Sequence, residues 1–77
     1  MTIPIKQDGG IDWFQVYRDA ERDAFAQARS FLANAKFCDP DKYPSDRYWR
    51  DYFVKEARRY NQCGVWHRRK AKEFANV

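Results

Sequence analysis

A single proline-containing segment divides this 77-residue chain into two stretches, and each stretch places its apolar residues at helical spacing. The segment runs from Cys38 to Pro44 and also holds Pro40 and two turn-forming aspartates, so no helix passes through it undisturbed. A chain of this length buries only about 60% of its unfolded surface and has room for one core. The sequence therefore predicts one all-α domain with a single clear connection.

The first helix is predicted over residues 12–36. Asp12 suits the N-cap position, and Gln15 stands three residues later, as in a capping box. Three alanines in successive turns would let a neighbouring helix approach closely: Ala20, Ala24 and Ala28. Residues 1–10 show no periodicity and end in Asp-Gly-Gly, which predicts a flexible N-terminal arm before a single helical domain over residues 11–77.

The second stretch begins at Ser45, a good N-cap residue, and leaves two alternatives at Gly64. A helix drawn through the glycine keeps two lines of residues seven apart: Phe53, Tyr60, His67 and Phe74, and beside them Ala57, Gly64 and Ala71. A glycine costs a helix about 1 kcal/mol relative to alanine, which such a packing face can offset. We therefore favour one long helix over about 45–75, giving an antiparallel helical hairpin. A break would give helices over 45–62 and 64–75 and a small three-helix domain.

The positive charge of the chain belongs to its second half. Residues 1–44 contain six Lys/Arg and seven Asp/Glu, whereas residues 45–77 contain nine Lys/Arg and four Asp/Glu. The net charges of these halves are therefore −1 and +5, and the chain carries +4 in total. Such an asymmetry bears on partners rather than on fold, and it favours polyanions or acidic protein surfaces.

Seven residues of the basic half are predicted to contact a partner: Arg58, Arg59, Trp66, Arg68, Arg69, Lys70 and Lys72. On a continuous helix Trp66 would stand among cations, on the side away from the packing line of Tyr60. Cations neutralise phosphates and an exposed ring can stack on bases, so we expect a non-enzymatic protein that contacts nucleic acid or a nucleoprotein complex. The alternative is an ordinary solvated face, with Trp66 packed against a neighbouring helix.

A rival function rests on the aromatic cluster of Tyr48, Trp49 and Tyr52 at the start of the second helix. Rings with polar tips are common interface anchors, so this cluster could dock on another protein. The chain would then be a small inhibitor or adaptor of the kind found in mobile genetic elements, acting on a host protein, with homodimerisation as a further means of burial. The simpler interpretation is that these rings close the loop end of the core.

Other kinds of chemistry find little support in the sequence. Cys38 and Cys63 have no zinc-like spacing, and about 27 Å of helix would separate them, so we expect free thiols and no metal or other cofactor. His67 lies in phase with the packing line, which favours a packing role over a catalytic one. No signal-peptide pattern or apolar stretch of membrane-spanning length occurs, so we expect a cytoplasmic protein without a membrane partner.

Overall fold

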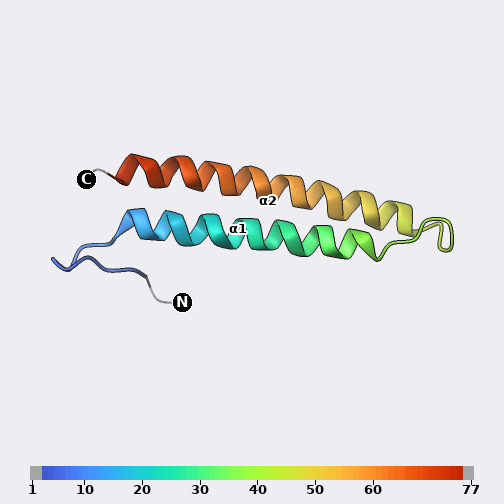
Figure 1. The fold of residues 1–77 in the computed structure, drawn as a ribbon, viewed down its shortest axis with the longest axis horizontal. Coiled ribbons are helices and arrows are strands. Elements are labelled where there is room, and N and C mark those ends of the chain that lie inside the picture. Colours follow the sequence, from blue (N-terminus) through green and yellow to red (C-terminus); the bar gives the residue numbers. More distant parts are fainter. Residues whose placement is uncertain (1–2, 76–77) are drawn as a thin grey trace.

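The computed structural model describes residues 3–75 as two antiparallel α-helices joined by one loop. Helix α1 runs Trp13–Lys36 and helix α2 runs Asp46–Phe74, and the two lie side by side along most of their length (Figure 1). Because α2 passes through Gly64 without a break, the hairpin is confirmed and the three-helix alternative is wrong. Residues 1–2 of the predicted arm and 76–77 of the predicted domain lie outside the described residues.

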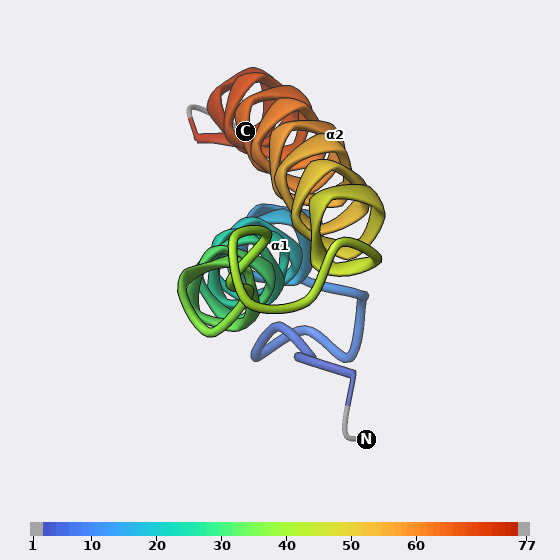
Figure 2. The same cartoon turned by 90° about the vertical axis from the view of Figure 1, so that its right-hand side faces the viewer.

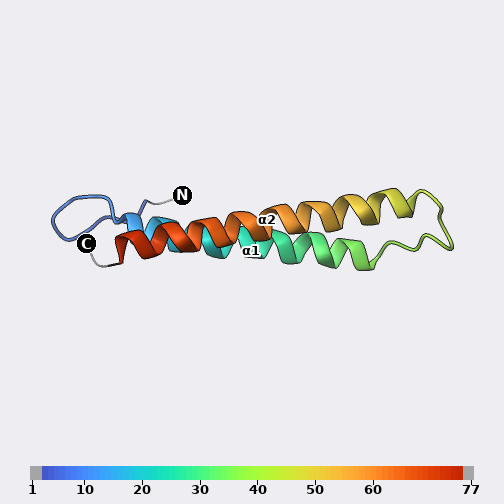
Figure 3. The same ribbon diagram turned by 90° about the horizontal axis from the view of Figure 1, so that it is seen from above.

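The molecule is long and flat. It extends 58 × 22 × 12 Å, and its Cα radius of gyration is 17.1 Å, against about 11 Å for a compact domain of this length. The views along and across the helices show one layer of two helices, with no other described helix over either broad face (Figures 2 and 3). Within residues 3–75, neither helix is long and apolar enough to cross a membrane.

Small residues form the seam between the two helices. The buried apolar positions are alanine or glycine: Ala24, Ala28, Ala35, Ala57, Gly64 and Ala71. Among the described residues, no large side chain is fully buried. Because these positions carry at most a methyl group, the two backbones can approach closely, as the alanine spacing predicts. Ala20 of the predicted alanine line is only partly buried and is not part of the seam.

Gly64 is the tightest point of this seam. A Cβ atom placed there would lie 2.7 Å from both Cε1 and Cζ of Phe25, well inside van der Waals contact. The ring of Phe25 therefore occupies the space that the glycine leaves open. The contact between α1 and α2 that this space allows offsets the helix propensity lost at a glycine in mid-helix.

Aromatic rings pack beside the seam rather than inside it. Near the end of the hairpin away from the loop, Tyr17 stacks on Phe74 with ring centroids 5.6 Å apart. Nearer the loop, Phe31 stacks on Tyr60 at 5.5 Å and lies 6.2 Å from Phe53. The predicted packing line on α2 is therefore confirmed, but its rings remain only half-buried.

One ion pair joins the helices across the seam. The Nε of Arg68 donates to Oε2 of Glu21 at 2.8 Å, and the Arg68 guanidinium also lies over the Phe25 ring, 5.3 Å from its centroid. Glu21 is only 7% exposed, whereas the Arg68 side chain is about half-exposed. The other carboxylate oxygen of Glu21 accepts no hydrogen bond and lies 3.6 Å from Arg18. Burial of this carboxylate therefore depends on Arg68.

The helix starts only partly follow the predictions. Asp12 caps α1, because its carboxylate accepts a hydrogen bond from the backbone NH of Gln15 at 3.1 Å. The side-chain amide of Gln15 donates to Asp19 and therefore does not complete a capping box. Ser45 makes no capping bond with its side chain. The described part of the arm is a hydrogen-bonded turn, closed by an isolated bridge between Ile5 and Ile11 and containing a glycine with φ of +85°.

The contact between Phe25 and Gly64 predicts that the effect of Gly64→Ala on the free energy of unfolding changes sign when the Phe25 ring is removed. In the wild-type background, Gly64→Ala should lower the free energy of unfolding by about 1–2 kcal/mol, because the added methyl displaces the Phe25 ring. In a Phe25→Ala background, the same change should raise it by about 1 kcal/mol through helix propensity alone. Urea denaturation followed by circular dichroism measures both. Equal effects in the two backgrounds would contradict the packing described here.

The Glu21–Arg68 pair predicts a contrast between single and double substitutions. Arg68→Ala should destabilise the hairpin by about 1–2 kcal/mol, because it removes the one side-chain hydrogen bond of a buried carboxylate and leaves only the 3.6 Å contact with Arg18. Replacing both partners by leucine should cost less than this single change. The control is Arg22→Ala, which removes surface pairs with Asp19 and Asp23 and should cost less than about 0.5 kcal/mol. Denaturation curves in which Arg22→Ala and Arg68→Ala cost the same would contradict this role for Arg68.

Candidate nucleic-acid interface

The seven predicted contact residues do not form one surface, because their ion pairs divide them. Arg68 belongs to the seam, where it holds Glu21 and covers Phe25. Arg59 lies 3.5 Å from Glu56, and Lys70 lies 3.4 Å from Glu73, both pairs being three residues apart on α2. These three cations are therefore partly compensated within the hairpin.

Three other predicted residues, Arg58, Arg69 and Lys72, are exposed and make no ion pair within residues 3–75. Lys55, one turn before Arg58, is exposed and unpaired in the same way. The four residues span about 26 Å of α2 at 1.5 Å per residue. We call this set of four the open basic stripe. Within the candidate site, it is the part whose positive charge remains available to a partner.

The sequence predicts that Trp66 stands among the cations on the solvent side of α2, but its ring contacts α1 instead. Its ring lies 5.1 Å from that of His67 and meets Tyr17 of α1 edge-on at 6.1 Å, while the Lys70 ammonium lies 5.5 Å above it. The residue nevertheless remains 50% exposed. The tryptophan thus extends the aromatic packing around Tyr17, so the alternative of packing against a neighbouring helix describes it better.

The aromatic cluster at the loop end is more exposed than a core-closing role requires. Tyr48, Trp49 and Tyr52 are between 41% and 66% exposed, and their rings contact one another edge-on at 5.3 and 6.0 Å. Only one side of the cluster meets the hairpin, through contacts of Trp49 and Tyr52 with Phe53. These rings therefore form an open apolar surface as well as a cover for Phe53.

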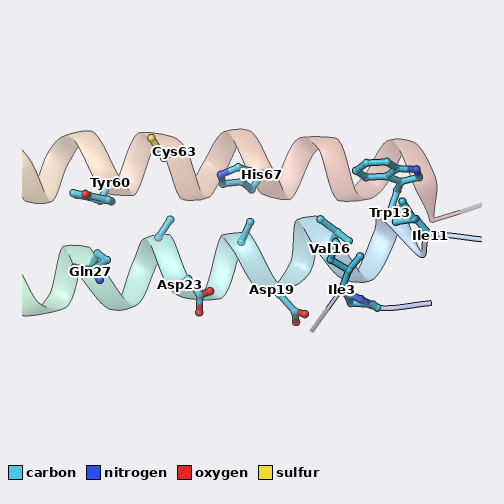
Figure 4. A pocket seen from close by; sticks show the side chains of 13 residues that line it. Ile3, Ile11, Trp13, Val16, Asp19, Asp23, Gln27, Tyr60, Cys63 and His67 are labelled. Atoms are coloured by element: carbon cyan, nitrogen blue, oxygen red, sulfur yellow. The ribbon is translucent and has the colours of Figure 1, made fainter. Parts of the chain in front are cut away.

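Sequence reasoning missed an apolar groove of about 540 Å³ that follows the seam on one face of the hairpin. Its walls come from both helices and from the arm, and include Val16, Ala20, Tyr60, Cys63 and His67 (Figure 4). The Nδ1 atom of His67 is buried and has no hydrogen-bond partner. The only sequence signal for the groove is that small Ala20 and Ala24 face larger neighbours, and this does not distinguish a groove from a filled seam.

The chemistry available to these residues is charge neutralisation and apolar contact. The two cysteine thiols are free, and Cys63 and His67 share the groove without a third group to orient them for nucleophilic catalysis. Asp19 and Asp23, one turn apart on α1, both lie beside Arg22, as expected for a solvated helix face. Within the described chain, the open basic stripe is therefore the feature best suited to an anionic partner.

Comparison of the chain with protein-family models, curated proteins and solved structures finds no match.

Proposed function

We propose that this chain is a non-enzymatic protein that binds the phosphate backbone of nucleic acid, free or within a nucleoprotein complex, through the open basic stripe of α2. One observation carries the proposal: Lys55, Arg58, Arg69 and Lys72 are exposed cations without ion pairs among the described residues, whereas the neighbouring Arg59, Arg68 and Lys70 are paired. Other exposed cations without ion pairs occur on both helices, but the four stripe residues recur at steps of three, eleven and three residues, which keeps them on one face of α2.

Phosphate contacts of this kind give affinity without reading sequence. Each cation that neutralises a phosphate releases a condensed counterion, so binding becomes strongly salt-dependent. The spacing of the stripe supports several contacts at once, because 26 Å of helix corresponds to about eight base pairs of B-DNA at 3.4 Å each. Trp66 is left out of the contact set because its ring packs on Tyr17 and His67.

A second candidate function is supported by the exposed rings of Tyr48, Trp49 and Tyr52. Aromatic residues in one open patch are typical anchors of protein interfaces, with surrounding charges acting as steering groups. In this case the chain is an inhibitor or adaptor that docks on an acidic partner protein. Truncation of Trp49 to alanine would then weaken partner capture more than reversal of the stripe charges.

Charge reversal of the stripe tests the proposal. The triple variant Arg58→Glu, Arg69→Glu, Lys72→Glu should abolish measurable binding to labelled duplex DNA, single-stranded DNA or duplex RNA in fluorescence anisotropy. Milder changes of the same three residues to glutamine should lower the slope of log affinity against log salt by roughly 2 to 3, because each lost phosphate contact removes about 0.9.

The matched control reverses three cations elsewhere, Lys6, Arg22 and Lys42, which gives the same change in net charge. Within residues 3–75, Lys6 makes no ion pair, Arg22 lies beside two aspartates, and Lys42 lies over the Tyr43 ring. This variant should keep most of the wild-type affinity. Equal losses in both triple variants would mean that net charge alone drives binding, and salt-insensitive binding would exclude the phosphate contacts.

A further inference from the structure

The hairpin exposes more surface than a monomer of its size normally does. Its accessible surface is 6326 Å², whereas a folded monomeric protein of 9.3 kDa is expected to expose about 5,000 Å². The surplus of roughly 1,300 Å² per chain exceeds the ~800 Å² that each partner buries in a standard protein interface. The hairpin therefore has enough uncovered surface for a stable complex with a second hairpin.

The surplus is apolar on the groove face. The groove is lined by the side chains of Val16, Ala20 and Tyr60, and Trp13 at its edge is 45% exposed. Over residues 16–27 the groove follows α1 for about 16 Å, which is long enough to receive a row of side chains from another helix. A shape of this kind fits a helix better than a small rounded ligand.

Charged residues lie at the rims of the same face. Asp19 and Asp23 line the α1 side of the groove, and Lys70 stands on α2 two residues after Arg68 and three residues after the groove residue His67. The contacts of Phe25 with Gly64 and of Glu21 with Arg68 set the register of the two helices. In this register Asp19 lies level with Lys70. At this height one rim carries Asp19 and the other carries Lys70, although Asp19 also lies 3.8 Å from Arg22 and Lys70 lies 3.4 Å from Glu73.

We propose that a second copy of this chain covers the groove, so that two hairpins form a four-helix bundle about a two-fold axis parallel to the helices. This axis places α1 of each copy over α2 of the other at the same height, and Asp19 of one copy then faces Lys70 of the second copy. A two-fold axis across the helices would instead place α1 over α1 and bring Asp19 close to Asp23 of the other copy. The like charges oppose that arrangement.

His67 belongs to the groove wall that the second copy covers. Its Nδ1 atom is buried within the hairpin without a hydrogen-bond partner, so this atom is not accessible to a carboxylate of the second copy. None of the stripe residues lines the groove, so the proposal is independent of nucleic-acid binding.

Sedimentation equilibrium of the nuclease-treated chain tests this dimer directly. The mass should be twice 9.3 kDa and should persist in about 1 M salt, where the Debye length falls to about 3 Å and nucleic-acid bridging is suppressed. A monomer at all micromolar concentrations would overturn the proposal. So would a mass that falls to that of the monomer when nucleic acid is removed.

A pair of matched substitutions locates the interface. Val16→Asp places a carboxylate in the groove and should weaken dimerisation by about 100-fold or more, because the symmetry buries two such groups. Val65→Asp is the control, since Val65 is exposed on α2 and does not line the groove. Circular dichroism should show both variants helical. Equal weakening by both variants, or none by Val16→Asp, would contradict the proposed face.

A charge swap tests the direction of the two-fold axis. Lys70→Glu should weaken the dimer by about 5-fold, as expected for loss of an interface ion pair on each side. Adding Asp19→Lys to the same chain should restore the lost affinity, because the pair re-forms with reversed signs. If the double variant is weaker than either single variant, then Asp19 does not face Lys70 of the second copy, and the proposed arrangement is wrong.

Discussion

The close approach of two helix backbones along a seam of alanine and glycine is the constraint on which the rest of this structure depends. Ala28 and Ala57 carry only a methyl side chain, so they let the helices approach until both residues are almost completely buried. The closeness leaves no interior volume for large residues. The rings of Tyr17, Phe31 and Phe53 therefore pack along the edges of the seam, where each stays partly exposed. A flat molecule with apolar edges follows from the small residues at its centre.

Helical spacing made much of this fold predictable from the sequence. The continuity of α2 through Gly64 and the line of Phe53, Tyr60, His67 and Phe74 follow from the phase of residues seven apart. The bounds of α1 follow from the cap at Asp12 and from the proline-containing segment after the helix. Phase alone could not show which charged residues turn toward the partner helix. Arg68 and Arg69 are adjacent and look equivalent in sequence, yet only Arg68 reaches Glu21, a residue 47 positions away. Phase also failed to predict the contact of Trp66 with α1. The backbone of this residue is on the outer side of α2, but its side chain is long enough for the ring to reach Tyr17.

In the sequence, the basic and aromatic residues of the second half look like one feature. In the structure they belong to two surfaces, the open basic stripe and the groove face. The open basic stripe contains Lys55, Arg58, Arg69 and Lys72, and none of them lines the groove. The groove face contains apolar residues from both helices, together with His67. Charge available to a polyanion and apolar surface available to another hairpin therefore occupy different residues. If both proposals hold, a dimer would carry two basic stripes, which raises avidity for a long polyanion without any new kind of contact.

The account depends most on the contact between Phe25 and Gly64, because this contact fixes both the closeness and the register of the helices. Nuclear magnetic resonance on the wild-type chain measures it directly. The account predicts nuclear Overhauser effects between the Phe25 ring protons and the Gly64 Hα protons, and Hα shifts displaced from ordinary helical values by the ring current. Absence of these effects, together with Gly64 shifts typical of a helix end, would contradict the close seam and the continuous α2.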